Sequence, residues 1–200
     1  MHEGWLWLVL SNSCFWRADL ILTVFLPLTL SNYGRNCYNE VWNGGFEKFL
    51  DGKPLYWSVY SSDGYPLADG TWFASGHYGA YLGGYDNAND ILMQYIYIPL
   101  NFSSAILSYE WYMQTEETDP LEYDYMYVRL YNTSGNLVKE LHKVSNLSAR
   151  GVWQKAMFDL SSDLRPYSGQ WLLLSFEAKT DFSNPTSFFL DNVSLWICWP

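Results

Sequence analysis

The chain has 200 residues, of which 49% are apolar and 20% aromatic. A chain of this length usually folds as one domain, and this share of apolar residues is enough for a sizeable core. The formal net charge of −10 argues against a nucleic-acid partner, because such surfaces neutralise phosphates with clustered Lys and Arg. An acidic surface is compatible with calcium, with neutral glycans and with solubility alone.

The first 36 residues differ from the rest and are predicted to form a leader. Residues 20–30 are an apolar run, LILTVFLPLTL, which is too short to span a membrane but has the length of a signal-peptide core. The preceding residues are rich in Trp and carry only Arg17, offset by Asp19, so a buried N-terminal strand is the alternative. We expect export, with residues 37–200 as the mature extracellular domain and no transmembrane span.

The cysteines support export. Cys14 lies within the expected leader, and its removal leaves the even pair Cys37 and Cys198. If the first and last strands are neighbours, these two sulfurs can form a disulfide bond. Closing so long a loop would stabilise the fold by about 4–5 kcal/mol on the chain-entropy model.

From residue 38 onward the sequence alternates between strand-like runs and turn signals. The turns contain Asp-Gly, Ser-Gly and Asn-rich segments, and no window keeps a helical period over three turns. This spacing predicts an all-β fold, a two-sheet antiparallel β-sandwich of the jelly-roll type. The expected strands are 40–50, 71–83, 90–99, 104–115, 122–132, 136–145, 152–160, 170–180 and 186–197.

Four of these runs alternate between apolar side chains, which we expect in the core, and a second set rich in Tyr. On adjacent strands the second set would offer rings that stack on sugars and polar groups that bind hydroxyls. Cross-strand tyrosine pairs that only stabilise the sheet, packing on another domain, or a wrong parity in one strand would explain the same residues. The candidate ligand-binding residues are Tyr95, Tyr97, Glu110, Tyr112, Gln114, Tyr125, Tyr127 and Arg129.

Several short motifs occur in an order that resembles a known family. They are NGGFE at 43–47, GHYGAYLGG at 76–84, DILMQ at 90–94 and FLDNV at 189–193. This order is similar to that of the accessory jelly-roll domains of secreted bacterial proteins, which resemble MAM domains and galactose-binding-like carbohydrate-binding modules. The resemblance extends from about residue 38 to 195 and rests on the ordered set, since no single motif is specific.

The resemblance implies a structural calcium ion held by Glu47 and Asp191, with backbone carbonyls completing its shell. Calcium takes six to eight oxygen ligands, so two carboxylates on adjacent terminal strands suit it. The alternative is that both carboxylates accept hydrogen bonds from backbone N–H groups. The resemblance also makes the end loops a second candidate for ligand binding, through Trp57, Tyr60, Tyr65 and Trp72.

No convergent catalytic set is found in the sequence. His77 and His142 lack a partner at metal-ligand spacing, and there is no nucleophile-elbow motif. A glycosidase could use two carboxylates of an acidic run, although acidic side chains in such a Pro-containing turn usually face water. The run contains Glu116, Glu117, Asp119, Glu122 and Asp124.

We therefore expect a secreted, non-catalytic module, stabilised by calcium, that binds carbohydrate or mediates adhesion at the cell surface. Its partner would be a glycan or a cell-surface protein. Two alternatives remain: a structural or assembly protein of the extracellular surface, and a glycoside-active jelly-roll enzyme.

Overall fold

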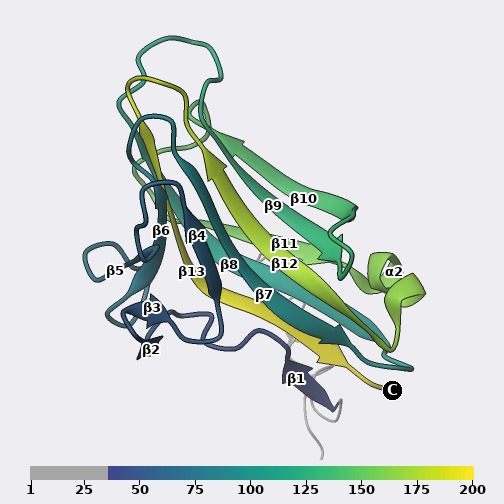
Figure 1. Cartoon of the computed structure of the whole chain (residues 1–200). Coiled ribbons are helices and arrows are strands. Elements are labelled where there is room, and N and C mark those ends of the chain that lie inside the picture. The colour runs from purple at the N-terminus through teal and green to yellow at the C-terminus, as the bar shows by residue number, and fades with distance from the viewer. Residues whose placement is uncertain (1–35) are drawn as a thin grey trace, which may run out of the picture. The chain divides into compact units, whose positions relative to one another are not determined.

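The computed structural model describes residues 36–200, which form two packed antiparallel sheets (Figure 1). The expected leader at 1–36, apart from Asn36, and Cys14 lie outside the described residues. The six-stranded sheet has the order β11 (Gln154–Asp159), β8 (Ser104–Thr115), β13 (Thr186–Cys198), β6 (Gly79–Gly83) and β5 (Ala68–Asp69), with β1 (Cys37–Asn39) also paired to β13. The five-stranded sheet has the order β10 (Leu137–Ser145), β9 (Tyr125–Asn132), β12 (Gln170–Lys179), β7 (Asn89–Ile98) and β4 (Ser58–Ser61).

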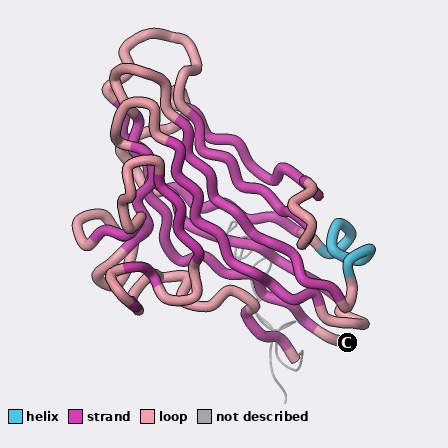
Figure 2. Tube along the Cα trace, viewed as in Figure 1, coloured by secondary structure: helices cyan, strands magenta, loops and turns pink. Residues whose placement is uncertain are grey.

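The remaining elements are small. The strands β2 (Phe49–Leu50) and β3 (Lys53–Pro54) form a hairpin. The helical turns α2 (Ser161–Leu164) and η1 (Arg165–Tyr167) connect β11 to β12, and Figure 2 shows them as a short helical segment among strands and loops. Within residues 36–200, no helix is long and apolar enough to cross a membrane. The predicted all-β sandwich is confirmed.

The core lies between the two sheets and is formed by the apolar half of each alternating strand. This is expected, because alternate side chains of a strand point to opposite faces of its sheet. The predicted inward sets of β7, β8, β9 and β12 are all buried: Leu92, Ile96, Ile98, Leu107, Tyr109, Trp111, Met113, Met126, Val128, Leu130, Leu172, Leu174 and Phe176.

Most of the segment 40–50 is a folded loop, and the expected strand there is wrong. Asn43 and Phe46 have positive φ angles of 53° and 57°, which no regular strand contains. The backbone N–H and C=O of Trp42 bond to the side chain of Gln94 instead of to a neighbouring strand. Only the last two residues of this segment, Phe49 and Leu50, belong to a strand, which is β2.

The expected strand at 71–83 is also shortened, to β6. The backbone N–H groups of Ala74 and Ser75 donate to Asp191, and those of His77 and Tyr78 donate to Glu47. Because these donors bond to carboxylates, they are not available to a partner strand. Residues 71–78 therefore form a loop beside the sheet.

The two chain ends of the described domain meet at a disulfide bond. In the β1–β13 pairing, Cys37 lies opposite Cys198, and the two are bonded. The closed loop spans a sequence separation of 161 residues. The bridge expected from the sequence is therefore present.

Candidate functional site

The outer face of the five-stranded sheet carries a cavity of about 360 Å³, here called the sheet cavity. Leu173, on the central strand β12, pairs with Tyr95 of β7 on one side and with Tyr131 of β9 on the other. The two tyrosines thus stand on either side of Leu173 in one row across the sheet. The lining residues are Ile91, Met93, Tyr95, Tyr131, Asn132, Thr133, Gly135, Leu173, Ser175 and Glu177.

A charged network borders the sheet cavity. Arg129 donates from Nη1 to Glu177 Oε2 at 2.8 Å and from Nη2 to Glu140 Oε2 at 2.8 Å. The guanidinium also lies over the ring of Tyr127, 3.9 Å from its centroid. These contacts hold Arg129 in one position, so the polar groups beside the cavity are already oriented before any ligand arrives.

Tyr131 is partly buried and lines the cavity beside Glu177. Burial, and after it the hydrogen bond and negative charge of Glu177, raise the pKa of Tyr131 above its ordinary value of 10.0. Tyr95, by contrast, is 56% exposed and presents its ring to solvent.

Five of the eight predicted face residues share this surface: Tyr95, Tyr97, Tyr125, Tyr127 and Arg129. Tyr97 packs on Trp171 with ring centroids 5.2 Å apart, and Tyr125 stacks on Tyr127 at 5.7 Å. The prediction omitted Tyr131, Trp171 and Glu177. Alternation along β9 could have identified Tyr131, which stands in parity with Arg129. Trp171 and Glu177 lie on β12, and only the pairing of β12 with β7 and β9 places them beside the selected residues.

The other three residues lie on the other sheet, so a single face of eight residues is wrong. Glu110, Tyr112 and Gln114 belong to β8, in the six-stranded sheet. Glu110 accepts a hydrogen bond from Asn192 Nδ2 at 2.8 Å. Tyr112 and Gln114 line a separate cavity of about 430 Å³ together with Arg150.

The end-loop aromatic residues are also separated. Trp57 is only 6% exposed, packs against Phe46 and Phe176, and donates from Nε1 to the carbonyl of Asn43. Its predicted ligand-binding role is therefore wrong, because it is a core residue. Trp72 stacks on Tyr112, with centroids 5.0 Å apart, over the six-stranded sheet.

Tyr60 and Tyr65 also lie in different places. Tyr60, on β4, pairs with Ile91, a residue that lines the sheet cavity. Tyr65 instead lines a third cavity of about 330 Å³, together with Tyr81 and Tyr85. The four end-loop candidates thus form no common site.

Glu47 and Asp191 both bind the loop 71–78. Glu47 Oε1 accepts from the N–H groups of His77 and Tyr78, at 2.7 and 3.0 Å. Asp191 Oδ2 accepts from those of Ala74 and Ser75, at 2.8 and 2.9 Å. This is the backbone-binding role that the sequence left open, and calcium at this pair stays a prediction.

A different acidic group could hold a metal ion. Donor oxygens of Glu117, Asp124 and Asp181 all lie within 4.8 Å of one another. Glu117 and Asp124 belong to the acidic run seen in the sequence, whereas Asp181 was not among the predicted ligands.

Comparison with known proteins finds the same fold. No protein-family model and no curated protein matches the chain. Among solved structures, TmCBM61 in complex with β-1,4-galactotriose matches with a TM-score of 0.55, 13% identity and coverage of 79% of this chain and 97% of that one. The chain has the β-sandwich fold of a carbohydrate-binding module. A cyclase from Fischerella sp. TAU matches with a TM-score of 0.50, 17% identity and coverage of 80% and 97%.

Proposed function

We propose that this chain is a secreted, non-catalytic module that binds carbohydrate on the outer face of its five-stranded sheet. The observation that carries the proposal is the sheet cavity, in which Tyr95 and Tyr131 flank Leu173 beside the Arg129–Glu177 ion pair. Adhesion to a glycan-coated surface would follow from such binding.

The spacing of the two tyrosines suits a sugar ring. They stand two strands apart, which is about 10 Å across a sheet. A ring in van der Waals contact on both faces needs about 7–8 Å between its neighbours, which side-chain tilt can provide. Aromatic rings would then cover the apolar faces of the sugar, while Asn132 and Thr133, the polar lining residues that are not buried, bind its hydroxyls.

A compartment outside the cytosol is part of the proposal. The Cys37–Cys198 disulfide supports it, because structural disulfides persist in oxidising environments. Calcium stabilisation through Glu47 and Asp191 also belongs to the proposal and rests on the sequence resemblance alone.

A glycosidase active site that uses Glu117 and Asp124 of the acidic run is disfavoured by burial. Asp124 has no exposed surface, and Glu117 is 6% exposed. A carboxylate that acts on a glycosidic bond must reach the substrate, and Asp124 cannot reach a polysaccharide. Binding is therefore preferred to catalysis.

Binding can be tested with Tyr95→Ala. Galacto-oligosaccharides are the first ligands to titrate, since TmCBM61 was solved with β-1,4-galactotriose, and a glycan array extends the search. We expect Tyr95→Ala to weaken binding at least about tenfold, as loss of a central aromatic contact usually does. Calorimetric titration measures the change.

Tyr65→Ala is the matched control, because Tyr65 is 52% exposed and lines a different cavity. Its affinity should equal that of the unmodified protein. Equal affinity of all three proteins would move the site away from the sheet cavity. Absence of binding to any glycan on the array would favour the alternative of a structural or assembly protein.

A further inference from the structure

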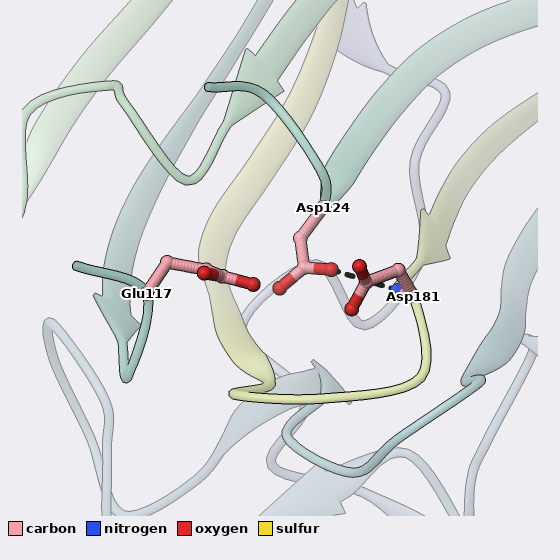
Figure 3. A group of neighbouring side chains, drawn as sticks. All are labelled: Glu117, Asp124 and Asp181. Atoms are coloured by element: carbon pink, nitrogen blue, oxygen red, sulfur yellow. Dashed lines mark hydrogen bonds between the residues drawn. The ribbon is translucent and has the colours of Figure 1, made fainter. Parts of the chain in front are cut away.

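Three acidic side chains meet where two loops of the sandwich come together, away from the sheet cavity (Figure 3). Glu117 lies in the loop that follows β8, and Asp124 directly precedes β9. Asp181 lies in the loop between β12 and β13. We call these residues the acidic loop cluster.

Asp124 is the central member and has an oxygen without a partner. Its side chain is completely buried. Oδ1 accepts a hydrogen bond from the backbone N–H of Asp181 at 2.9 Å, whereas Oδ2 is buried and has no hydrogen-bond partner. In Figure 3 the carboxylate of Asp124 lies between the other two, and its free oxygen points toward Glu117. A buried carboxylate oxygen without a donor is unfavourable unless something positive binds it.

Among residues 36–200, no basic side chain forms an ion pair with the acidic loop cluster. The ion pairs formed within residues 36–200 all involve other carboxylates. Burial, and after it the negative charges of Asp124, Asp181 and Asp119, raise the pKa of Glu117. The three carboxylates therefore repel one another unless a cation or a proton lies between them.

We propose that the acidic loop cluster binds a divalent cation, with calcium the best-suited ion. All three side chains supply hard carboxylate oxygens and none supplies nitrogen or sulfur, which selects calcium or magnesium over zinc. Calcium is preferred because its coordination tolerates irregular geometry and a variable number of water ligands. The ion would tie the β8–β9 loop to the β12–β13 loop.

This site is distinct from the pair Glu47 and Asp191. Their carboxylates accept backbone N–H donors of the loop 71–78, whereas Asp124 Oδ2 accepts none. It is also independent of glycan binding, because its residues do not line the sheet cavity. A proton shared between Glu117 and Asp124 would fill the same space, so the experiment must separate a metal ion from a proton.

The experiment starts with the full chain stripped by chelator and titrated with calcium. We expect the melting temperature to rise by roughly 5–10 °C when calcium reaches about 100 times its Kd. Terbium should bind at the same place as a luminescent calcium probe. Tyr123, which directly precedes Asp124 in the chain, is the aromatic residue that should sensitise it.

Glu117→Gln and Asp124→Asn test the assignment. Both keep the side-chain shape and remove one charge, so calcium affinity should fall at least about tenfold in each. Glu116→Gln is the matched control, because Glu116 is the exposed neighbour in the same loop and its affinity should not change. If Asp124→Asn does not fold, Glu117→Gln, at a position with some exposure, decides alone.

Two results would overturn the proposal. Absence of saturable calcium and terbium binding would leave the shared proton as the explanation. Full calcium affinity in Glu117→Gln and Asp124→Asn, together with its loss in Glu47→Gln, would place the ion at Glu47 and Asp191 instead.

Discussion

Glu117 shows how a single side chain can make stability depend on pH. Burial and the neighbouring negative charges raise its pKa above the ordinary value of 4.5. The folded protein therefore keeps a proton on Glu117 at pH values where the unfolded chain has released it. Without a bound cation, the contribution of Glu117 to the free energy of unfolding falls as the pH rises above 4.5. An ordinary ion-paired carboxylate has the opposite effect, because its lowered pKa makes the free energy of unfolding rise with pH.

Glu117→Gln should remove this pH dependence. In chelator, we expect the variant to be more stable than the unmodified protein at pH 7, with a smaller difference near pH 4, because glutamine cannot ionise. Urea unfolding followed by tryptophan fluorescence at several pH values measures this. Glu116→Gln should follow the unmodified protein at every pH, and a Glu117→Gln profile parallel to that of the unmodified protein would contradict the prediction.

At the scale of elements, a bulge in β13 contacts the loop that contains Gly44. The pairing of β13 with β8 shifts register between Asp191 and Ser194, where Asn192 has a φ of 52°. Inside this bulge, the N–H of Val193 donates to the carbonyl of Gly44 at 2.9 Å. The two backbones are so close that a Cβ at Gly44 would lie 1.8 Å from the carbonyl oxygen of Val193.

Gly44→Ala should therefore destabilise the domain. The new methyl group meets backbone, which cannot rotate away as a side chain does, so we expect a loss of about 1–3 kcal/mol, as in other overpacked sites. The urea midpoint reports it. Gly45→Ala is the control, because a Cβ there meets only Asp191 Oδ1 at 3.7 Å and Asn192 Oδ1 at 4.0 Å. Equal midpoints for the two variants would show that the bulge can move.

The long strands could be predicted from sequence, but the irregular ones could not. β7, β8, β9 and β12 are 8 to 12 residues long. β7 and β9 alternate over nearly their whole length and β8 over most of it, whereas β12 is an apolar run between turn signals, so local pattern is sufficient for them. The segments 40–50 and 71–78 depend on distant side chains, such as Gln94 for Trp42 and Asp191 for Ala74. β4 has only four residues, too few for a period to be seen.

The candidate site could be predicted only in part, for a related reason. Alternation shows which residues of one strand share a face, but not which strands share a sheet. β8 and β9 follow each other in sequence, and consecutive strands are usually neighbours. Here the loop 116–124 crosses between the sheets, which separates Tyr112 from Tyr127. The same crossing brings Asp181 close to Asp124, 57 residues away in sequence.

At the scale of the whole domain, the disulfide joins the two ends of the described chain. β1 has three residues and pairs only with β13, so its own hydrogen bonds hold it weakly. The Cys37–Cys198 bond closes a loop with a sequence separation of 161 residues. On the chain-entropy model, this restricts the unfolded state and stabilises the fold by about 4–5 kcal/mol.

Replacing both cysteines by serine tests this contribution. We expect the double variant to melt roughly 8–20 °C lower, which is that free energy converted for a domain of this size. A reductant should lower the melting temperature of the unmodified protein similarly and leave that of the variant unchanged. An unchanged melting temperature after reduction would mean that β1 detaches without unfolding the rest.

Glycan affinity provides a second measurement on the same double variant. The disulfide lies on the six-stranded sheet, whereas Tyr95 and Tyr131 lie on the five-stranded sheet. The sheet cavity is lined by β7, β9, β12 and the loop after β9, none of which pairs with β1. Below its melting temperature, the variant should therefore bind galacto-oligosaccharides with unchanged affinity. A loss of affinity while the domain is still folded would show that the β1–β13 pairing and the sheet cavity are coupled through the core.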